Sequence, residues 1–171
     1  MRKVYWFLFF FSGFMQSLPA QDSRLYAFTN YTVKDGLASY NTQSVVQDEQ
    51  GYIWIGTING LQRFDGTRFI TFRHNPADPH ALPDNYIYQL HIDKEQHLWV
   101  LLNNGKIGIF DTRRFVFKEV KIRLKNQRHL TAIRSLLEDS GGNLFYVIPH
   151  EEILTFSKKN NEFAAVHNPF D

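Results

Sequence analysis

The pattern of apolar residues after the N-terminus predicts short β-strands that are buried on both faces. Tyr52 and Trp54 fall on one face of an extended strand, because successive side chains alternate. Ile53 and Ile55 fall on the opposite face. A sheet with one face in water alternates apolar and polar residues, whereas a strand covered on both faces is apolar throughout. Since tight turns separate the strands, we expect antiparallel sheets stacked on one another.

Turn residues divide this region into four predicted strands. Asp48 and Gly51 bracket a tight connection, and Asp65-Gly66 is a strong two-residue hairpin signal. The predicted strands are Val45–Gln47, Tyr52–Thr57, Leu61–Phe64 and Phe69–Phe72.

The same pattern returns twice, at intervals of 45 and 46 residues. In each copy an aspartate precedes an aromatic residue by six positions. These pairs are Asp48–Trp54, Asp93–Trp99 and Asp139–Phe145. Further repeat positions are Gly51, Gly60, Phe64 and Phe110, followed by Phe69, Phe115 and Phe163 as matching aromatics. A period of roughly 40–50 residues is typical of a four-stranded propeller blade. We predict copies at residues 41–72, 86–124 and 132–166, joined by turn-rich connectors.

About three copies predict an all-β, incomplete β-propeller, because a closed ring typically needs roughly four to eight blades. The outer strand of the second copy alternates Lys121, Arg123 and Lys125 with apolar residues. We interpret these cations as a solvated edge that discourages pairing with another strand. The open blade faces should make the isolated chain associate. In a full ring we expect Phe28–Thr32, ahead of the first copy, to pair with the last blade. Because that blade is not part of this chain, we expect the segment to be mobile here.

Residues 1–20 have the layout of a cleavable signal peptide. Arg2 and Lys3 precede an apolar run from Val4 to Phe11, and a small residue, Ala20, lies at the predicted cut. The run is shorter than the roughly 20 apolar residues of a membrane span. The sequence therefore predicts export, with residues 21–171 as the mature chain.

Charge and composition exclude several classes of protein. Removing Arg2 and Lys3 from the 19 basic residues leaves 17, equal to the 17 acidic ones. A neutral chain lacks the excess of cations that drives binding to nucleic acid, so we expect no nucleic-acid contact. With no cysteine, the chain has no disulfide, thiolate nucleophile or cysteine-ligated zinc.

The remaining candidates for chemistry are sparse. His91 and Asp93 lie on one face of a predicted strand, and His97 follows the turn. These residues do not form a recognised set of metal ligands. We therefore predict no metal and no cofactor. The carboxylate pairs Glu151-Glu152 and Asp48-Glu49 suggest glycoside hydrolysis. Neighbouring strand residues point to opposite faces, however, and turn aspartates usually cap the backbone, so we predict no catalytic residue. Repetition marks Trp54 and Trp99 as core rather than as sugar-stacking residues, and the ligand-binding residues stay unknown.

The first copy resembles the two-component regulator propeller repeat. The resemblance rests on Asp35-Gly36-Leu37, Val45–Asp48, Gly51–Thr57 and Gly60–Gly66, and continues at Leu82–Ile87. Departures are Gln96 at the turn glycine, Leu101-Leu102 for Gly-Thr, and Phe145 for tryptophan.

This resemblance implies the N-terminal part of a periplasmic sensor region. In the family, about fourteen repeats form two seven-bladed propellers, followed by an immunoglobulin-like domain, a membrane span and a histidine kinase. Many members sense oligosaccharides and switch on genes for glycan breakdown. The implied partners are therefore an oligosaccharide, the remaining blades, the membrane and kinase domains, and a second copy in a homodimer. No kinase-type helix occurs here, so this segment is expected to have no enzyme activity.

Two other functions remain open from the sequence, because a fold does not fix a function. One is a secreted, carbohydrate-active propeller enzyme. The other is an extracellular propeller that serves as a platform for protein interactions.

Processing provides the first test. Because the apolar run is short and ends at Pro19-Ala20, exported protein should begin at Gln21 or within one or two residues of it. N-terminal sequencing and intact mass will show this. Membrane-extracted protein that retains Arg2 and Lys3 would contradict the signal-peptide interpretation.

Overall fold

The computed structural model describes residues 27–124, 134–150 and 152–165. The described residues from Tyr31 onward belong to one compact unit. The described part of this unit contains twelve β-strands and one 3-10 helix, η1 (Val33–Asp35). The predicted all-β fold is confirmed. The predicted signal peptide lies outside the described residues, and within these no helix is long and apolar enough to cross a membrane.

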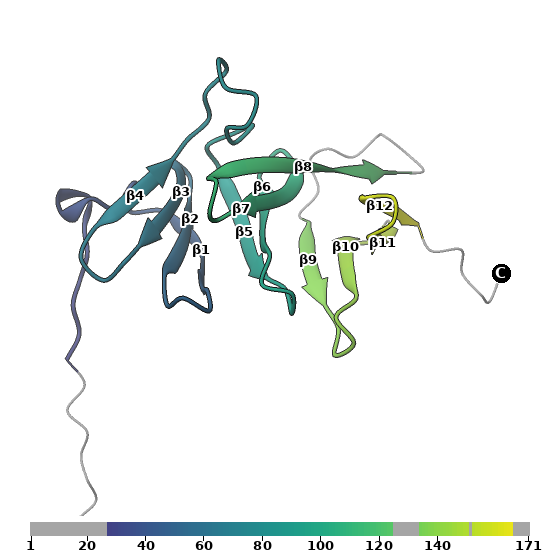
Figure 1. Ribbon diagram of the computed structural model, residues 1–171, viewed down its shortest axis with the longest axis horizontal. Helices are drawn as coiled ribbons and strands as arrows, with labels where there is room; N and C mark the ends of the chain where they lie inside the picture. The colour runs from purple at the N-terminus through teal and green to yellow at the C-terminus, as the bar shows by residue number, and fades with distance from the viewer. Residues whose placement is uncertain (1–26, 125–133, 151, 166–171) are drawn as a thin grey trace, which may run out of the picture. The chain divides into compact units, whose positions relative to one another are not determined.

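The strands form three four-stranded antiparallel groups, which we call blades and which follow one another along the chain (Figure 1). Blade 1 comprises β1 (Thr42–Gln47), β2 (Ile53–Thr57), β3 (Gly60–Phe64) and β4 (Phe69–Phe72). Blade 2 comprises β5 (Ile87–Ile92), β6 (Leu98–Leu102), β7 (Ile107–Asp111) and β8 (Val116–Arg123). Blade 3 comprises β9 (Ser135–Glu138), β10 (Leu144–Ile148), β11 (Glu152–Ser157) and β12 (Glu162–Ala165).

Each pair of neighbouring blades encloses its own apolar core. The face of blade 1 that carries Trp54 and Leu61 packs against blade 2, including Leu98 and Phe110. The face of blade 2 that carries Trp99 packs against blade 3 in a second cluster. Blade 2 is therefore covered on both sides, which is why all five residues of its strand β6 are buried.

The innermost strands of neighbouring blades are joined through side chains rather than by a backbone ladder. Ser44 lies at a bulge in β1, and its hydroxyl accepts the Leu90 N–H at 3.0 Å. Gln89 lies at the matching bulge in β5. Its side-chain amide donates to the Leu136 carbonyl at 2.8 Å and accepts the Leu136 N–H at 2.9 Å.

The outer edge of blade 2 differs from the prediction. We expected its basic residues to keep the edge unpaired, but β8 runs parallel to β12, with Lys121, Ile122 and Arg123 opposite residues 162–164. The cation does not prevent pairing because Arg123 forms an ion pair with Glu162 at 3.0 Å. Blades 2 and 3 consequently share one eight-stranded sheet. The third basic residue of this run, Lys125, lies outside the described residues.

The repeat position assigned to Phe115 is also wrong. Phe64 pairs with Phe69 across the hairpin of blade 1, and Phe110 pairs with Phe117 in blade 2. Phe117 is therefore the structural match. The hairpin of blade 2 is two residues longer, and Phe115 lies within its turn, with φ of +60°.

Tyr31 and Thr32, in the segment for which we expected mobility, contact blade 1 and η1. The Tyr31 ring lies edge-on to Phe64 at 4.8 Å between centroids, and Thr32 caps η1. Beyond η1, the buried amide of Gln62 accepts the Ala38 N–H at 2.7 Å and donates to the Gly36 carbonyl at 2.9 Å. This segment covers the outer strands of blade 1.

The uncovered face of blade 3 predicts self-association of the 171-residue chain. Leu137 is 53% exposed and Ile153 is 60% exposed, although both lie in strands. Ile153→Lys should shift analytical ultracentrifugation profiles toward monomer, because it places a charge on this apolar face. Ala77→Lys, in an exposed connector, is the matched control and should leave association unchanged. A monodisperse wild-type monomer with a sharp, concentration-independent thermal transition would contradict the open-face interpretation.

Candidate functional site

The turn between the first two strands of every blade is built on one aspartate. One carboxylate oxygen (Oδ1) accepts the backbone N–H groups two and four residues later. In all three blades these distances fall between 2.8 and 3.1 Å, for Asp48, Asp93 and Asp139. The turns therefore repeat in geometry as well as in sequence.

The second carboxylate oxygen holds the repeat tryptophan. The Trp54 indole N–H donates to Asp48 at 2.7 Å, and the Trp99 indole N–H donates to Asp93 at 2.8 Å. Both rings are almost fully buried, so this bond satisfies a polar group that would otherwise be costly to bury. The six-residue spacing between aspartate and tryptophan indicated the repeat. The sequence analysis did not predict that the two side chains form a hydrogen bond.

Blade 3 replaces the tryptophan and compensates within the turn. Phe145 has no indole N–H, and the side-chain amide of Asn143 donates to the free oxygen of Asp139 at 2.8 Å instead.

The turn glycine is also replaceable. Gly51 has φ of +86°, and Gln96 takes the matching left-handed conformation at +66°. The substitution noted in the sequence thus leaves the turn geometry intact.

The repeat position Gly60 is one where a side chain would not fit. Its φ is +118°, and a Cβ there would lie 2.6 Å from the Phe72 carbonyl oxygen. It accordingly closes the tight turn between β2 and β3.

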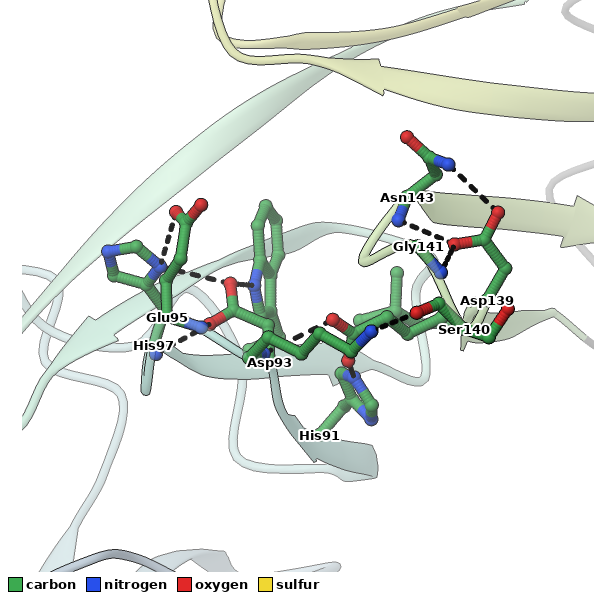
Figure 2. A network of polar contacts seen from close by, with 12 residues as sticks. His91, Asp93, Glu95, His97, Asp139, Ser140, Gly141 and Asn143 are labelled. Atoms are coloured by element: carbon green, nitrogen blue, oxygen red, sulfur yellow. Dashed lines mark hydrogen bonds and ion pairs between the residues drawn. The ribbon is translucent and has the colours of Figure 1, made fainter.

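Blade 2 gathers one set of metal-type ligands. Among the described residues, Asp93, Glu95 and His97 bring ligand atoms within 4.8 Å of one another. His97 Nδ1 lies 2.9 Å from Asp93 and 3.8 Å from Glu95 (Figure 2). Both oxygens of Asp93 already accept two donors each, so an ion would have to displace the bonds that close the turn. The donor set does not fit a resident metal.

Polar contacts extend from this turn to blade 3. His91 Nε2 lies 2.8 Å from one oxygen of Glu138, whose other oxygen accepts the Lys94 N–H at 3.1 Å. The Lys94 ammonium donates to the Ser140 carbonyl. His91 thus points to a carboxylate of the next blade and not to His97.

A cleft of about 330 Å³ lies between blades 2 and 3 at this end. Asp93, Glu95 and Glu138 contribute carboxylates, while Lys94 and Lys158 contribute ammonium groups. Lys158 pairs with Glu95. These contacts hold the blades together, and the arrangement can bind polar groups.

The suggested glycosidase pairs do not form a catalytic arrangement. The Asp48 carboxylate is engaged by the turn, and Glu151 lies outside the described residues. The pairing needed for hydrolysis is therefore not found in the described residues.

Hydrogen bonding sets the charge state of the turn. Burial alone would raise the pKa of Asp93, but hydrogen bonds from Trp99 and His97 outweigh it and hold that pKa below its usual value. The Asn143 side chain and backbone likewise lower the pKa of Asp139.

Comparison with known proteins fits this geometry. The model of the two-component regulator propeller family matches residues 36–59, which contain the turn of Asp48 and its tryptophan. Residues 36–59 are therefore similar to the two-component regulator propeller repeat. A relative named histidine kinase P4, from Formosa agariphila, is 41% identical over 68 residues, which are 40% of this chain and 5% of the kinase.

Solved structures share the propeller fold. An extracellular domain attributed to a hybrid two-component system of B. thetaiotaomicron has a TM-score of 0.68 at 19% identity, over 81% of this chain and 20% of that one. A second such domain has a TM-score of 0.57 at 26% identity, over 71% and 17%. Virginiamycin B lyase from Staphylococcus aureus reaches 0.54 at 16% identity, over 75% and 42%. The propeller repeats described here thus span about a fifth of the solved extracellular domains.

Substitution of the turn aspartates tests their role in the propeller repeat. Asparagine has one acceptor oxygen where aspartate has two, so Asp93→Asn should leave the Trp99 N–H without a partner. We expect a loss of about 1–3 kcal/mol in the free energy of unfolding, measured by urea titration. Asp139→Asn is the matched control and should cost less, because the Asn143 amide can rotate to offer its oxygen. Equal losses would contradict this account.

The pH dependence of the free energy of unfolding should also change in Asp93→Asn. Because the pKa of Asp93 is lower in the folded state, its contribution to stability is present above about pH 4 and is lost as pH falls through the lowered pKa. Asp93→Asn should remove this part of the acid destabilisation.

Proposed function

We propose that this chain is the N-terminal part of the periplasmic ligand-sensing propeller of a two-component system, and that it takes part in recognising an oligosaccharide that regulates glycan-utilisation genes. The match of residues 36–59 to the two-component regulator propeller repeat carries the proposal. The relative named histidine kinase and the extracellular domains of similar fold support it.

The site chemistry favours binding over catalysis. Turn carboxylates are occupied by backbone and indole donors, whereas the clefts at the blade seams are lined by polar and aromatic groups. Kinase activity would belong to the full-length protein, which would be a homodimer anchored in the inner membrane. The second candidate is a secreted propeller enzyme, because the fold is also similar to that of virginiamycin B lyase.

Transcription in the native host tests the proposal. Deleting the gene should abolish the induction of glycan-utilisation genes by one class of oligosaccharide, while growth on the free monosaccharide stays normal. A full-length copy should restore induction, and a copy lacking residues 2–20 should not, because the sensor would remain inside the cell. Unchanged induction in the deletion strain, or bond cleavage by the exported protein, would contradict the proposal.

A further inference from the structure

The seam between blades 1 and 2 contains an arginine that the fold does not explain. The Arg63 guanidinium carbon lies 4.3 Å from the ring centroid of Tyr52 and 5.3 Å from that of Phe115. Its Nε atom is buried and has no hydrogen-bond partner among the described residues. Leaving a buried charged donor unpaired is costly, so this Nε–H would be stabilised by an acceptor.

Phe115 is held in a conformation that phenylalanine rarely adopts. Its φ of +60° lies in the left-handed region, where a bulky side chain is unfavourable. The matching turn position of blade 3 is Asn161, at +51°, and asparagine tolerates this conformation. The strain places an aromatic ring, 40% exposed, beside Arg63 and 5.0 Å from Phe72. Local strain of this kind concentrates at binding and catalytic sites.

Both residues line a cleft of about 310 Å³, together with Tyr52, Gln50 and Arg113. This volume is at the small end of the range of roughly 300–1,000 Å³ for small-molecule sites. The Asp48 carboxylate also lines the cleft, but its oxygens accept the turn N–H groups and the Trp54 indole. The guanidinium groups of Arg63 and Arg113 outnumber this one carboxylate, so the charged lining is positive overall.

We infer that this seam is a subsite for an anionic sugar unit that carries a carboxylate or a sulfate. A guanidinium binds such planar or branched oxyanions through two parallel hydrogen bonds, and the rings of Tyr52 and Phe115 supply apolar surface for a sugar face. The inference rests on the proposed function and narrows its ligand to acidic oligosaccharides.

Calorimetric titration of the full-length protein tests the subsite. The probes are trigalacturonate, its carboxyl-reduced neutral form, a sulfated galactan oligosaccharide and inorganic sulfate. We expect at least one acidic oligosaccharide to bind at least tenfold more tightly than the neutral form, and the two acidic probes to distinguish carboxylate from sulfate. Arg63→Gln should weaken that binding at least tenfold. Arg68→Gln, at an exposed hairpin position, is the control and should bind as wild type.

Several outcomes would overturn the inference. Equal binding of acidic and neutral forms, or undiminished binding by Arg63→Gln, would do so while leaving oligosaccharide sensing intact. Binding of inorganic sulfate alone would show only a general anion site. No binding of any oligosaccharide would overturn both this inference and the proposed function.

Phe115→Asn separates a binding role from a packing role. This variant has the residue type that blade 3 carries at the same position, so the backbone strain is relieved while the ring is lost. We expect the melting temperature to stay within a few degrees of wild type and acidic-oligosaccharide binding to weaken severalfold. A lower melting temperature with unchanged binding would make the ring a packing element and would refute its role in the subsite.

Discussion

A β-sheet that is apolar on both faces is stable in water only while both faces are covered, and this requirement organises the whole chain. Blade 2 meets it through its two neighbours, whereas blades 1 and 3 each have one neighbour. On blade 1, the segment from Tyr31 to Ala38 covers part of the open face, with the buried Gln62 amide as its anchor. Blade 3 has no such cover among the described residues, and Leu137 and Ile153 remain exposed.

Burying a tryptophan between blades creates a second requirement, since the indole N–H needs an acceptor. The turn aspartate meets this need and closes the turn with the same carboxylate. One side chain thus links local turn geometry to packing between blades. In blade 3, where Phe145 removes the donor, Asn143 uses the spare oxygen, so the turn keeps its form without the tryptophan.

The sequence was sufficient to predict features that depend on short-range spacing. The all-β fold, the blade period and the burial of Trp54 follow from residues within a single copy. Features that depend on loop length or on distant strands were not predictable in the same way. Because the hairpin of blade 2 is longer, the matching aromatic residue is Phe117 and not Phe115. The pairing of β8 with β12 depends on two strand edges that are distant in sequence and adjacent in space. The cluster around Arg63 joins two blades, so no local pattern indicated it.

The bulges of the innermost strands have a consequence for how such arrays are assembled. Ser44 reaches Leu90 with a short side chain, and Gln89 reaches Leu136 with a longer one that imitates a peptide group. Two side chains of different length thus perform the same task at successive seams. The innermost strands of neighbouring blades are linked by side-chain hydrogen bonds at their bulges, so this link does not depend on the aromatic residues that fill the two cores.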